Sequence, residues 1–129
     1  MEQFFLDTPQ EGLIDITAKV RNAVRRSNIR QGICQVFVPH TTAGVTVNEN
    51  ADPDVVTDML AALKHMVPKL SYHHSEGNSP AHVKSSLVGC SLTLPIEDSD
   101  IVLGTWQGVY FCEFDGPRKR KFFVQVVGV

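Results

Sequence analysis

The sequence predicts an α+β domain of about seven strands and three helices. Apolar and polar residues alternate over Leu92–Ile96, which is typical of a half-buried strand. Asp52-Pro53 and Ser79-Pro80 each place a capping side chain before a proline, which is typical of a helix start. The predicted strands cluster along the chain instead of alternating with helices. That order favours α+β over a doubly wound α/β fold.

The composition indicates one globular domain covering residues 1–129. Hydrophobic residues make up 43% and charged residues 20%, far from the composition of disordered chains. The formal net charge of −2 argues against nucleic acid as a partner, since a nucleic-acid footprint needs a basic excess. No apolar run approaches the roughly 18–20 residues that span a bilayer, and no signal peptide is visible, so no membrane partner is expected.

The cysteines Cys34, Cys90 and Cys112 are odd in number and widely spaced, and they lie in apolar segments. This pattern fits neither a disulfide framework nor a CxxC site. We expect three buried thiols in a reducing cytoplasm.

The first half of the chain shows a strand, a helix and two further strands. Phe4–Leu6 opens with an apolar run, and from Ile16 the apolar residues recur at helical spacing until about Asn28. Asp15 and Thr17 are both available as the N-cap of this helix. The next predicted strands are Ile33–Val38 and Gly44–Asn48.

The second half predicts two helices followed by strands. The helix opening at Asp52-Pro53 has an apolar face and stops at Pro68, and the helix opening at Ser79-Pro80 runs to about Val88. Asp115-Gly116-Pro117 is a predicted turn. The remaining predicted strands are Leu92–Ile96, Ile101–Leu103, Thr105–Phe114 and Lys121–Val127.

Histidines and carboxylates gather in two polar segments, His40–Asp52 and His74–Ser86. Imidazoles beside carboxylates suit a zinc-type site with three protein ligands and an open water position. They equally suit general acid–base catalysis, because histidine titrates near neutral pH. Polar surface and helix capping are the simpler interpretation, above all for Asp52 and Ser79. The basic tract Arg118–Lys121, beside a turn, is expected to be a solvated edge.

Three blocks of sequence resemble the YjbQ-like family, some members of which carry the label "secondary thiamine-phosphate synthase enzyme". The blocks are PHTTAGVTVNENADPDV (Pro39–Val55), HSEGNSPAHVKSSLVG (His74–Gly89) and LGTWQGVYFCEFDGPRKR (Leu103–Arg120). The resemblance implies a mixed β-sandwich-like α+β fold that assembles as a homotrimer or a dimer of trimers. It also implies a pocket lined by His40, Asn48, Glu49, His74, Glu76, His82, Ser85 and Gln107.

Two functions follow as hypotheses. In the first, the chain is a small-molecule enzyme in which His40, His74 and His82 hold a divalent metal, zinc or magnesium, or polarise the substrate. Glu49 or Glu76 acts as base, and Asn48, Ser85 and Gln107 position the ligand. Zinc-activated water would suit hydrolysis.

The family label implies a secondary thiamine-phosphate synthase activity, and a phosphorylated substrate would need cationic contacts. Lys84, Arg118, Lys119 and the start of the helix at Pro80 are the candidates for these contacts. In the second hypothesis, the protein is a non-catalytic trimeric binding or regulatory module for a small anionic metabolite.

Two features leave alternatives open. His73 and His74 stand side by side, and we expect His74 to face the pocket. Trp106 and the strand Val109–Phe114 form either a subunit interface or part of the core.

Overall fold

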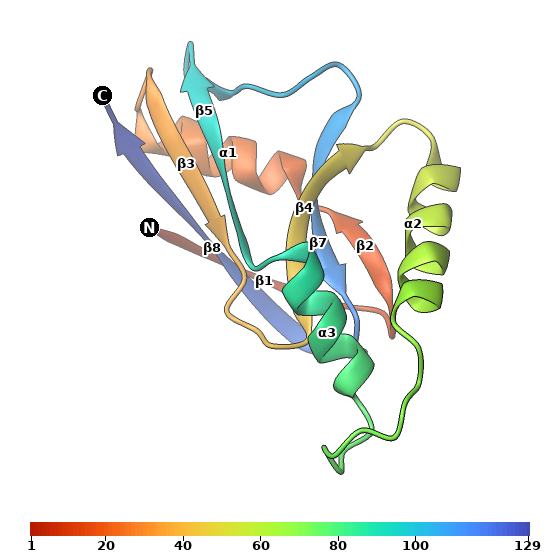
Figure 1. Cartoon of the computed structure of the whole chain (residues 1–129). Coiled ribbons are helices and arrows are strands. Elements are labelled where there is room, and N and C mark those ends of the chain that lie inside the picture. The colour runs from red at the N-terminus through yellow and green to blue at the C-terminus, as the bar shows by residue number, and fades with distance from the viewer.

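The computed structural model describes residues 1–129 and confirms the α+β fold (Figure 1). It contains eight strands and three helices. The strand that the pattern missed is Gly12–Asp15, because its four residues are too few to show alternation. The elements in chain order are β1 (Glu2–Asp7), β2 (Gly12–Asp15), α1 (Thr17–Ser27), β3 (Gly32–Phe37), β4 (Ala43–Glu49), α2 (Pro53–Met66), α3 (Ser79–Val88), β5 (Ser91–Glu97), β6 (Asp100–Ile101), β7 (Gln107–Glu113) and β8 (Lys119–Gly128).

The strands form two sheets in which every neighbouring pair is antiparallel. One sheet has five strands in the order β1-β8-β3-β5-β6, and the other has three in the order β2-β7-β4. The chain passes from the small sheet to the large one through the turn between β7 and β8 (Figure 1). The two sheets therefore meet at that turn.

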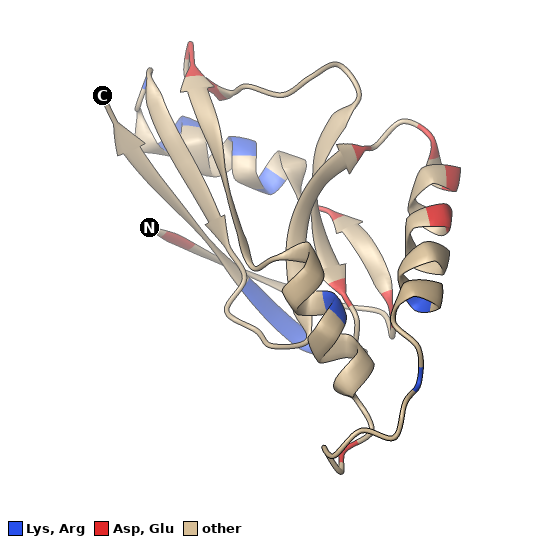
Figure 2. Ribbon diagram, viewed as in Figure 1, with Lys and Arg blue, Asp and Glu red and all other residues tan.

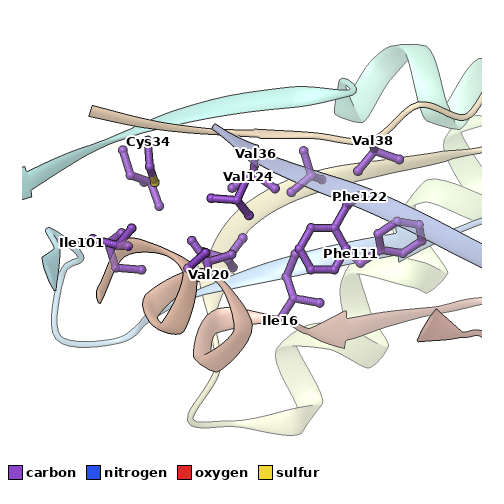
Figure 3. Close-up of a cluster of buried hydrophobic side chains, with 14 of the residues drawn as sticks. Ile16, Val20, Cys34, Val36, Val38, Ile101, Phe111, Phe122 and Val124 are labelled. Carbon is purple, nitrogen blue, oxygen red and sulfur yellow. The ribbon is translucent and has the colours of Figure 1, made fainter. Parts of the chain in front are cut away.

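The main core lies between the two sheets and α1 (Figure 3). Val20 and Val24 of α1 meet Val36 and Val124 of the large sheet and Phe111 of the small one. The strands of the large sheet bury every second residue, because only their inner face is covered. β7 is buried almost continuously, since α2 and α3 cover the other face of the small sheet.

The burial of β7 corrects one expectation. Its side chains are buried inside their own chain, so the strand Val109–Phe114 is not available as a subunit interface. Trp106, just before this strand, is 63% exposed, and the alternative that it packs in the core is wrong. The indole lies in solvent because Trp106 belongs to the connection before β7, which begins only at Gln107.

The start of α2 and the end of α1 follow the local signals, but the other two helix starts correct the expected caps. The N-caps of α1 and α3 are Ile16 and Asn78, and neither makes a side-chain cap, so Asp15, Thr17 and Ser79 are not the N-caps. Asp52 Oδ1 accepts a hydrogen bond from the Asp54 amide at 2.9 Å, and Asp15 Oδ1 accepts one from the Thr17 amide at 2.9 Å. Asn28 ends α1 in the left-handed conformation. At the end of α3, the Val45 amide of β4 donates to the Gly89 carbonyl at 3.0 Å. A Cβ on Gly44 would lie 2.5 Å from that carbonyl oxygen, so the close approach requires glycine there.

Two cysteines are buried as expected, but Cys90 is exposed between α3 and β5, which corrects the expectation of three buried thiols. All three are free thiols. No helix combines the length and the apolar character needed to cross a membrane.

Candidate active site

A polar cavity of about 440 Å³ lies where three connecting segments meet. These segments are the β3–β4 loop, the α2–α3 loop with the first turn of α3, and the β7–β8 turn; they converge at the lower end of the view in Figure 1. None of the lining residues is hydrophobic. The lining consists of Pro39, His40, Thr41, Thr42, His74, Glu76, Asn78, His82, Asp115, Arg118 and Arg120.

His40 is held rigidly at one wall of the cavity. Its Nε2 accepts a hydrogen bond from the backbone amide of Lys121 at 3.0 Å. Its ring lies edge-on to Phe111, with the ring centroids 6.4 Å apart. Burial, followed by the charge of Arg120, lowers the pKa of His40 below its ordinary value of 6.5. The ring is therefore neutral at physiological pH.

His74 and His82 form a pair that lines the same cavity. Their ring centroids are 5.5 Å apart in an edge-to-face arrangement. His74 Nε2 lies 3.8 Å from Glu76 Oε2. His82 is held in the first turn of α3, whereas His74 belongs to the loop before that helix. His73 does not line the cavity.

A buried ion pair supports the floor of the cavity. Arg120 Nε donates to Glu113 Oε1 at 2.7 Å, and Arg120 Nη2 donates to Glu113 Oε2 at 2.5 Å. The same Nη2 reaches Thr42 Oγ1 at 2.8 Å, and Thr8 Oγ1 donates to Glu113 Oε1 at 2.5 Å. Burial raises the pKa of Glu113, but hydrogen bonds from Arg120, Thr8 and the Asp115 amide outweigh it, and the pKa lies below its ordinary value.

This pair corrects the expectation that Arg118–Lys121 is a solvated edge. Figure 2 shows the basic residues along the first part of β8, yet Arg120 is only 6% exposed. Its side chain points inward because β8 alternates, with Arg120, Phe122 and Val124 on the covered face. Only its flanking residues Lys119 and Lys121 lie on the outer face.

Asp115 links two further lining residues. Its Oδ2 accepts hydrogen bonds from Asn78 Nδ2 and from Arg118 Nη2, each at 2.9 Å. Burial raises the pKa of Asp115, but these hydrogen bonds and the charge of Arg118 outweigh it, so the pKa is lowered. Asn78 Oδ1 is the one buried side-chain oxygen or nitrogen atom without a hydrogen-bond partner. This oxygen is shielded from solvent, so it is an unsatisfied acceptor within the folded chain.

The other predicted site residues lie elsewhere in the chain. Ser85 is buried and does not line the cavity, and its Oγ donates to the Ala43 carbonyl at 2.6 Å. Asn48, Glu49 and Gln107 lie at the far ends of β4 and β7, since Ala43 pairs with Glu113 but Glu49 pairs with Gln107. Six residues of antiparallel strand separate these pairs by about 20 Å. A single chain does not bring them to the histidines, and their role stays a prediction.

Of the predicted phosphate contacts, Arg118 lines the cavity and Lys119 does not. Lys84 is buried beside Glu11, with Nζ 3.3 Å from Oε1, and lies over the ring of Phe114. Thr42 and Asn78 lie within the two predicted polar segments, whereas Asp115 and the Glu113–Arg120 pair were not predicted as site residues. An acid inside the apolar run VYFCEF was a signal for a buried partner of opposite charge.

The arrangement does not form a complete metal centre within one chain. No three histidine, cysteine or acidic side chains are placed together to hold an ion. His40 Nε2 is occupied by the Lys121 amide, which leaves His74 and His82 as paired imidazoles. The donors present are therefore suited to hydrogen bonding and proton transfer.

Comparison with known proteins gives consistent matches over nearly the whole chain. The model of the family described as "UPF0047 protein YjbQ-like" matches residues 2–129. UPF0047 protein MJ1081 of Methanocaldococcus jannaschii is 53% identical over 120 residues, which cover 92% of this chain and 87% of that protein. UPF0047 protein YugU of Bacillus subtilis is 47% identical, with 94% of this chain and 93% of that protein covered.

Solved structures agree with the fold. A YjbQ/UPF0047 family protein of Clostridium acetobutylicum superposes with a TM-score of 0.96 at 51% identity, covering 98% of this chain and 100% of that one. A protein of unknown function from Sulfolobus solfataricus superposes with a TM-score of 0.94 at 32% identity, covering 99% and 96%. These relatives share the fold, and their descriptions state no reaction.

Proposed function

The chain belongs to the YjbQ-like UPF0047 family, and from that premise we propose that its cavity binds a small, polar, phosphate-bearing metabolite on which His74 and His82 transfer protons. The observation that carries this proposal is a cavity without a hydrophobic lining residue, in which two imidazoles lie 5.5 Å apart between ring centroids. Pockets for apolar ligands are lined mainly by hydrophobic and aromatic side chains. A fully polar lining favours a ligand rich in oxygen atoms.

Three features favour a phosphate group on this ligand. Arg118 lines the cavity, and a guanidinium pairs well with phosphate oxygens. The cavity lies at the first turn of α3, whose N-cap Asn78 makes no side-chain cap, so backbone N–H groups and the helix dipole favour an anion there. His74 and His82 add donors, and each gains positive charge when protonated.

The imidazole pair suits general acid–base catalysis. One ring can accept a proton from the ligand while the other donates one, and Glu76 lies close enough to orient His74. The secondary thiamine-phosphate synthase activity that the resemblance implies would use the same phosphate contacts. We propose it as a side activity of this cavity, because no paired-aspartate motif for metal diphosphate is present.

A divalent metal is a second candidate, favoured by the approach of His74, His82 and Glu76. Two imidazoles would supply two ligands for zinc, but zinc sites normally use three or four. Magnesium prefers oxygen ligands, so of this set only Glu76 suits it. One chain does not supply a complete set of ligands, so a metal here would need further ligands from outside the chain. Metal analysis of tag-free protein, with His74→Asn and His82→Asn as variants, tests this candidate.

Assembly into a homotrimer, or a dimer of trimers, is proposed from the resemblance. The outer face of the large sheet exposes Phe5, Ile33, Phe37 and Val127, and exposed apolar groups of this kind favour association. Light scattering after size exclusion would give three or six times the chain mass of 14.3 kDa. A cytoplasmic location is proposed from the free buried thiols.

The test of the main proposal is calorimetric titration with inorganic phosphate, followed by a screen of phosphate esters for turnover. His74→Asn, His82→Asn and Arg118→Gln should each weaken phosphate binding about tenfold, the magnitude of one charge-assisted hydrogen bond. His73→Asn is the matched control, because His73 is an exposed neighbour that does not line the cavity. Equal binding by His73→Asn and His74→Asn would exclude His74 from the site, and no binding by wild type would refute the phosphate proposal.

A further inference from the structure

His40 accepts a backbone hydrogen bond from β8 just beyond the point where β3 stops pairing with β8. β3 ends at Phe37, which pairs with Phe123 of β8, and the chain then turns through Val38 and Pro39. β8 begins at Lys119, so the amide of Lys121 faces a side from which β3 has turned away. The imidazole of His40 takes the place of the missing strand carbonyl and accepts this amide through Nε2 at 3.0 Å.

This hydrogen bond decides where the proton of the ring lies. A nitrogen that accepts a hydrogen bond carries no proton, so a neutral ring must carry its proton on Nδ1. The Nδ1 atom has no protein partner, since the bond with Lys121 is the one hydrogen bond that the ring makes. It is also not sealed inside the protein, because Asn78 Oδ1 is the one buried side-chain polar atom without a partner. His40 thus presents an unused N–H group at the cavity wall.

We infer that His40 is a fixed, neutral Nδ1–H donor that binds an acceptor oxygen of the ligand, and that it is neither a metal ligand nor a general base. The identity of the ligand in this inference rests on the proposed function. The protonation of the His40 ring does not. A metal ligand would need the Nδ1 lone pair and would place a proton on Nε2, against the N–H of Lys121. A base would need a free lone pair, but the lone pair of Nε2 accepts from Lys121 and Nδ1 carries the proton.

The surroundings hold the ring in this state. Phe111 packs edge-on against it, and the Arg120 guanidinium, fixed by Glu113, lies near enough to disfavour a second positive charge. Burial is the largest cause of the lowered pKa of His40, and together with Arg120 it outweighs the opposite effects of the Lys121 backbone and of Glu113. The Nδ1–H group of His40 stays neutral. Its hydrogen bond to a ligand oxygen therefore does not require His40 to take up a proton.

The ligand atom that fits this donor is a phosphoryl oxygen. His40, the His74–His82 pair and Arg118 line the same cavity, and they come from three different connecting segments. A phosphate group in the cavity presents several oxygens and can accept from more than one wall at once. The inference therefore adds His40 to the groups that bind the phosphate, and separates it from the pair that transfers protons.

The first test reads the ring directly in ligand-free protein. Long-range hydrogen–nitrogen correlation spectra of histidine-labelled protein near pH 7.5, assigned by the peak lost in His40→Asn, report which nitrogen of His40 carries the proton. We expect protonated Nδ1 and unprotonated Nε2. A proton on Nε2 would overturn the inference whether or not the protein binds phosphate.

The second test uses two matched substitutions. In His40→Gln, the amide oxygen can reach the place of Nε2 and accept from Lys121, but no donor remains at Nδ1. In His40→Asn, the amide nitrogen stands near the place of Nδ1, but the acceptor for Lys121 is lost. We expect His40→Gln to keep its melting temperature and to bind inorganic phosphate about tenfold more weakly.

For His40→Asn we expect the reverse, with a melting temperature lower by about 5 °C and phosphate binding within about threefold of wild type. Stronger phosphate binding by His40→Gln than by His40→Asn would contradict the assignment. If wild type binds no phosphate, the proposed function fails, while the nuclear magnetic resonance spectra and the melting temperatures still decide the state of His40.

Discussion

Glu113 and Arg120 join the two sheets directly beneath the candidate site. Glu113 is the last residue of β7 in the small sheet, and Arg120 is near the start of β8 in the large sheet. Their bidentate pair, with Glu113 fully buried, closes the turn that carries Asp115 and Arg118 into the cavity. The stability of the fold and the shape of the site therefore depend on the same contact.

Glu113→Gln should destabilise the protein by about 3–5 kcal/mol, because Arg120 would keep its charge in a buried place without a carboxylate. Urea unfolding followed by circular dichroism measures the change. Glu97→Gln on the exposed face of β5 is the control and should stay within about 0.5 kcal/mol of wild type. A loss of less than about 1 kcal/mol in Glu113→Gln would show that the pair contributes little.

Acid should destabilise the protein in two steps, which follow from lowered pKa values in the folded state. The pKa of His40 lies below 6.5, so the unfolded chain binds its proton first and stability falls as the pH drops below about 6.5. The pKa of Glu113 lies below 4.5, so its contribution is present above that value and is lost as the pH falls through the folded pKa.

Unfolding free energies measured from pH 8 to pH 3 test both steps. His40→Asn should flatten the curve below about pH 6.5, and Glu113→Gln should flatten it below about pH 4.5. An unchanged slope in either variant would remove that residue as the cause.

Ser85→Ala should destabilise the protein by about 1–3 kcal/mol, because the Ala43 carbonyl would lose its buried donor. Ser86→Ala, one residue further along α3 and exposed, is the matched control with little expected change. Thermal unfolding measures both. Phosphate titration of Ser85→Ala then separates two roles. If the affinity falls only in proportion to the unfolded fraction of the variant, Ser85 has a structural role. A larger fall would support its predicted role in the site.

Only Cys90 should react with a thiol reagent in the native protein. Cys90 is exposed, whereas burial raises the pKa of Cys34 to about 11 and that of Cys112 to about 12. Mass spectrometry of native protein treated with iodoacetamide near pH 8 should show one modification. Labelling of all three thiols at equal rates without denaturant would contradict the burial of Cys34 and Cys112.

Most of the secondary structure was predictable because its signals are local. Asp52-Pro53 starts α2, Asn28 ends α1, and the alternation over Leu92–Ile96 marks β5, each within a few neighbouring residues. β2 was not predicted because its four residues are too few to show a pattern. Its pairing partner, β7, lies far along the chain, so no local signal marks the pair. The two polar segments that meet at the cavity were also visible, since histidines in strand-end and helix-start positions stand out from the apolar pattern.

The sequence by itself determined the α+β class, the helix boundaries and the histidines of the candidate site. Only the tertiary structure decided that Arg120 turns inward to Glu113, that His40 gives its Nε2 to Lys121, and that Glu49 and Gln107 lie far from the histidines. These facts depend on which strands become neighbours and in which register. Contacts between residues that are distant in the chain arise when the two sheets pack together. Local sequence patterns do not predict these contacts.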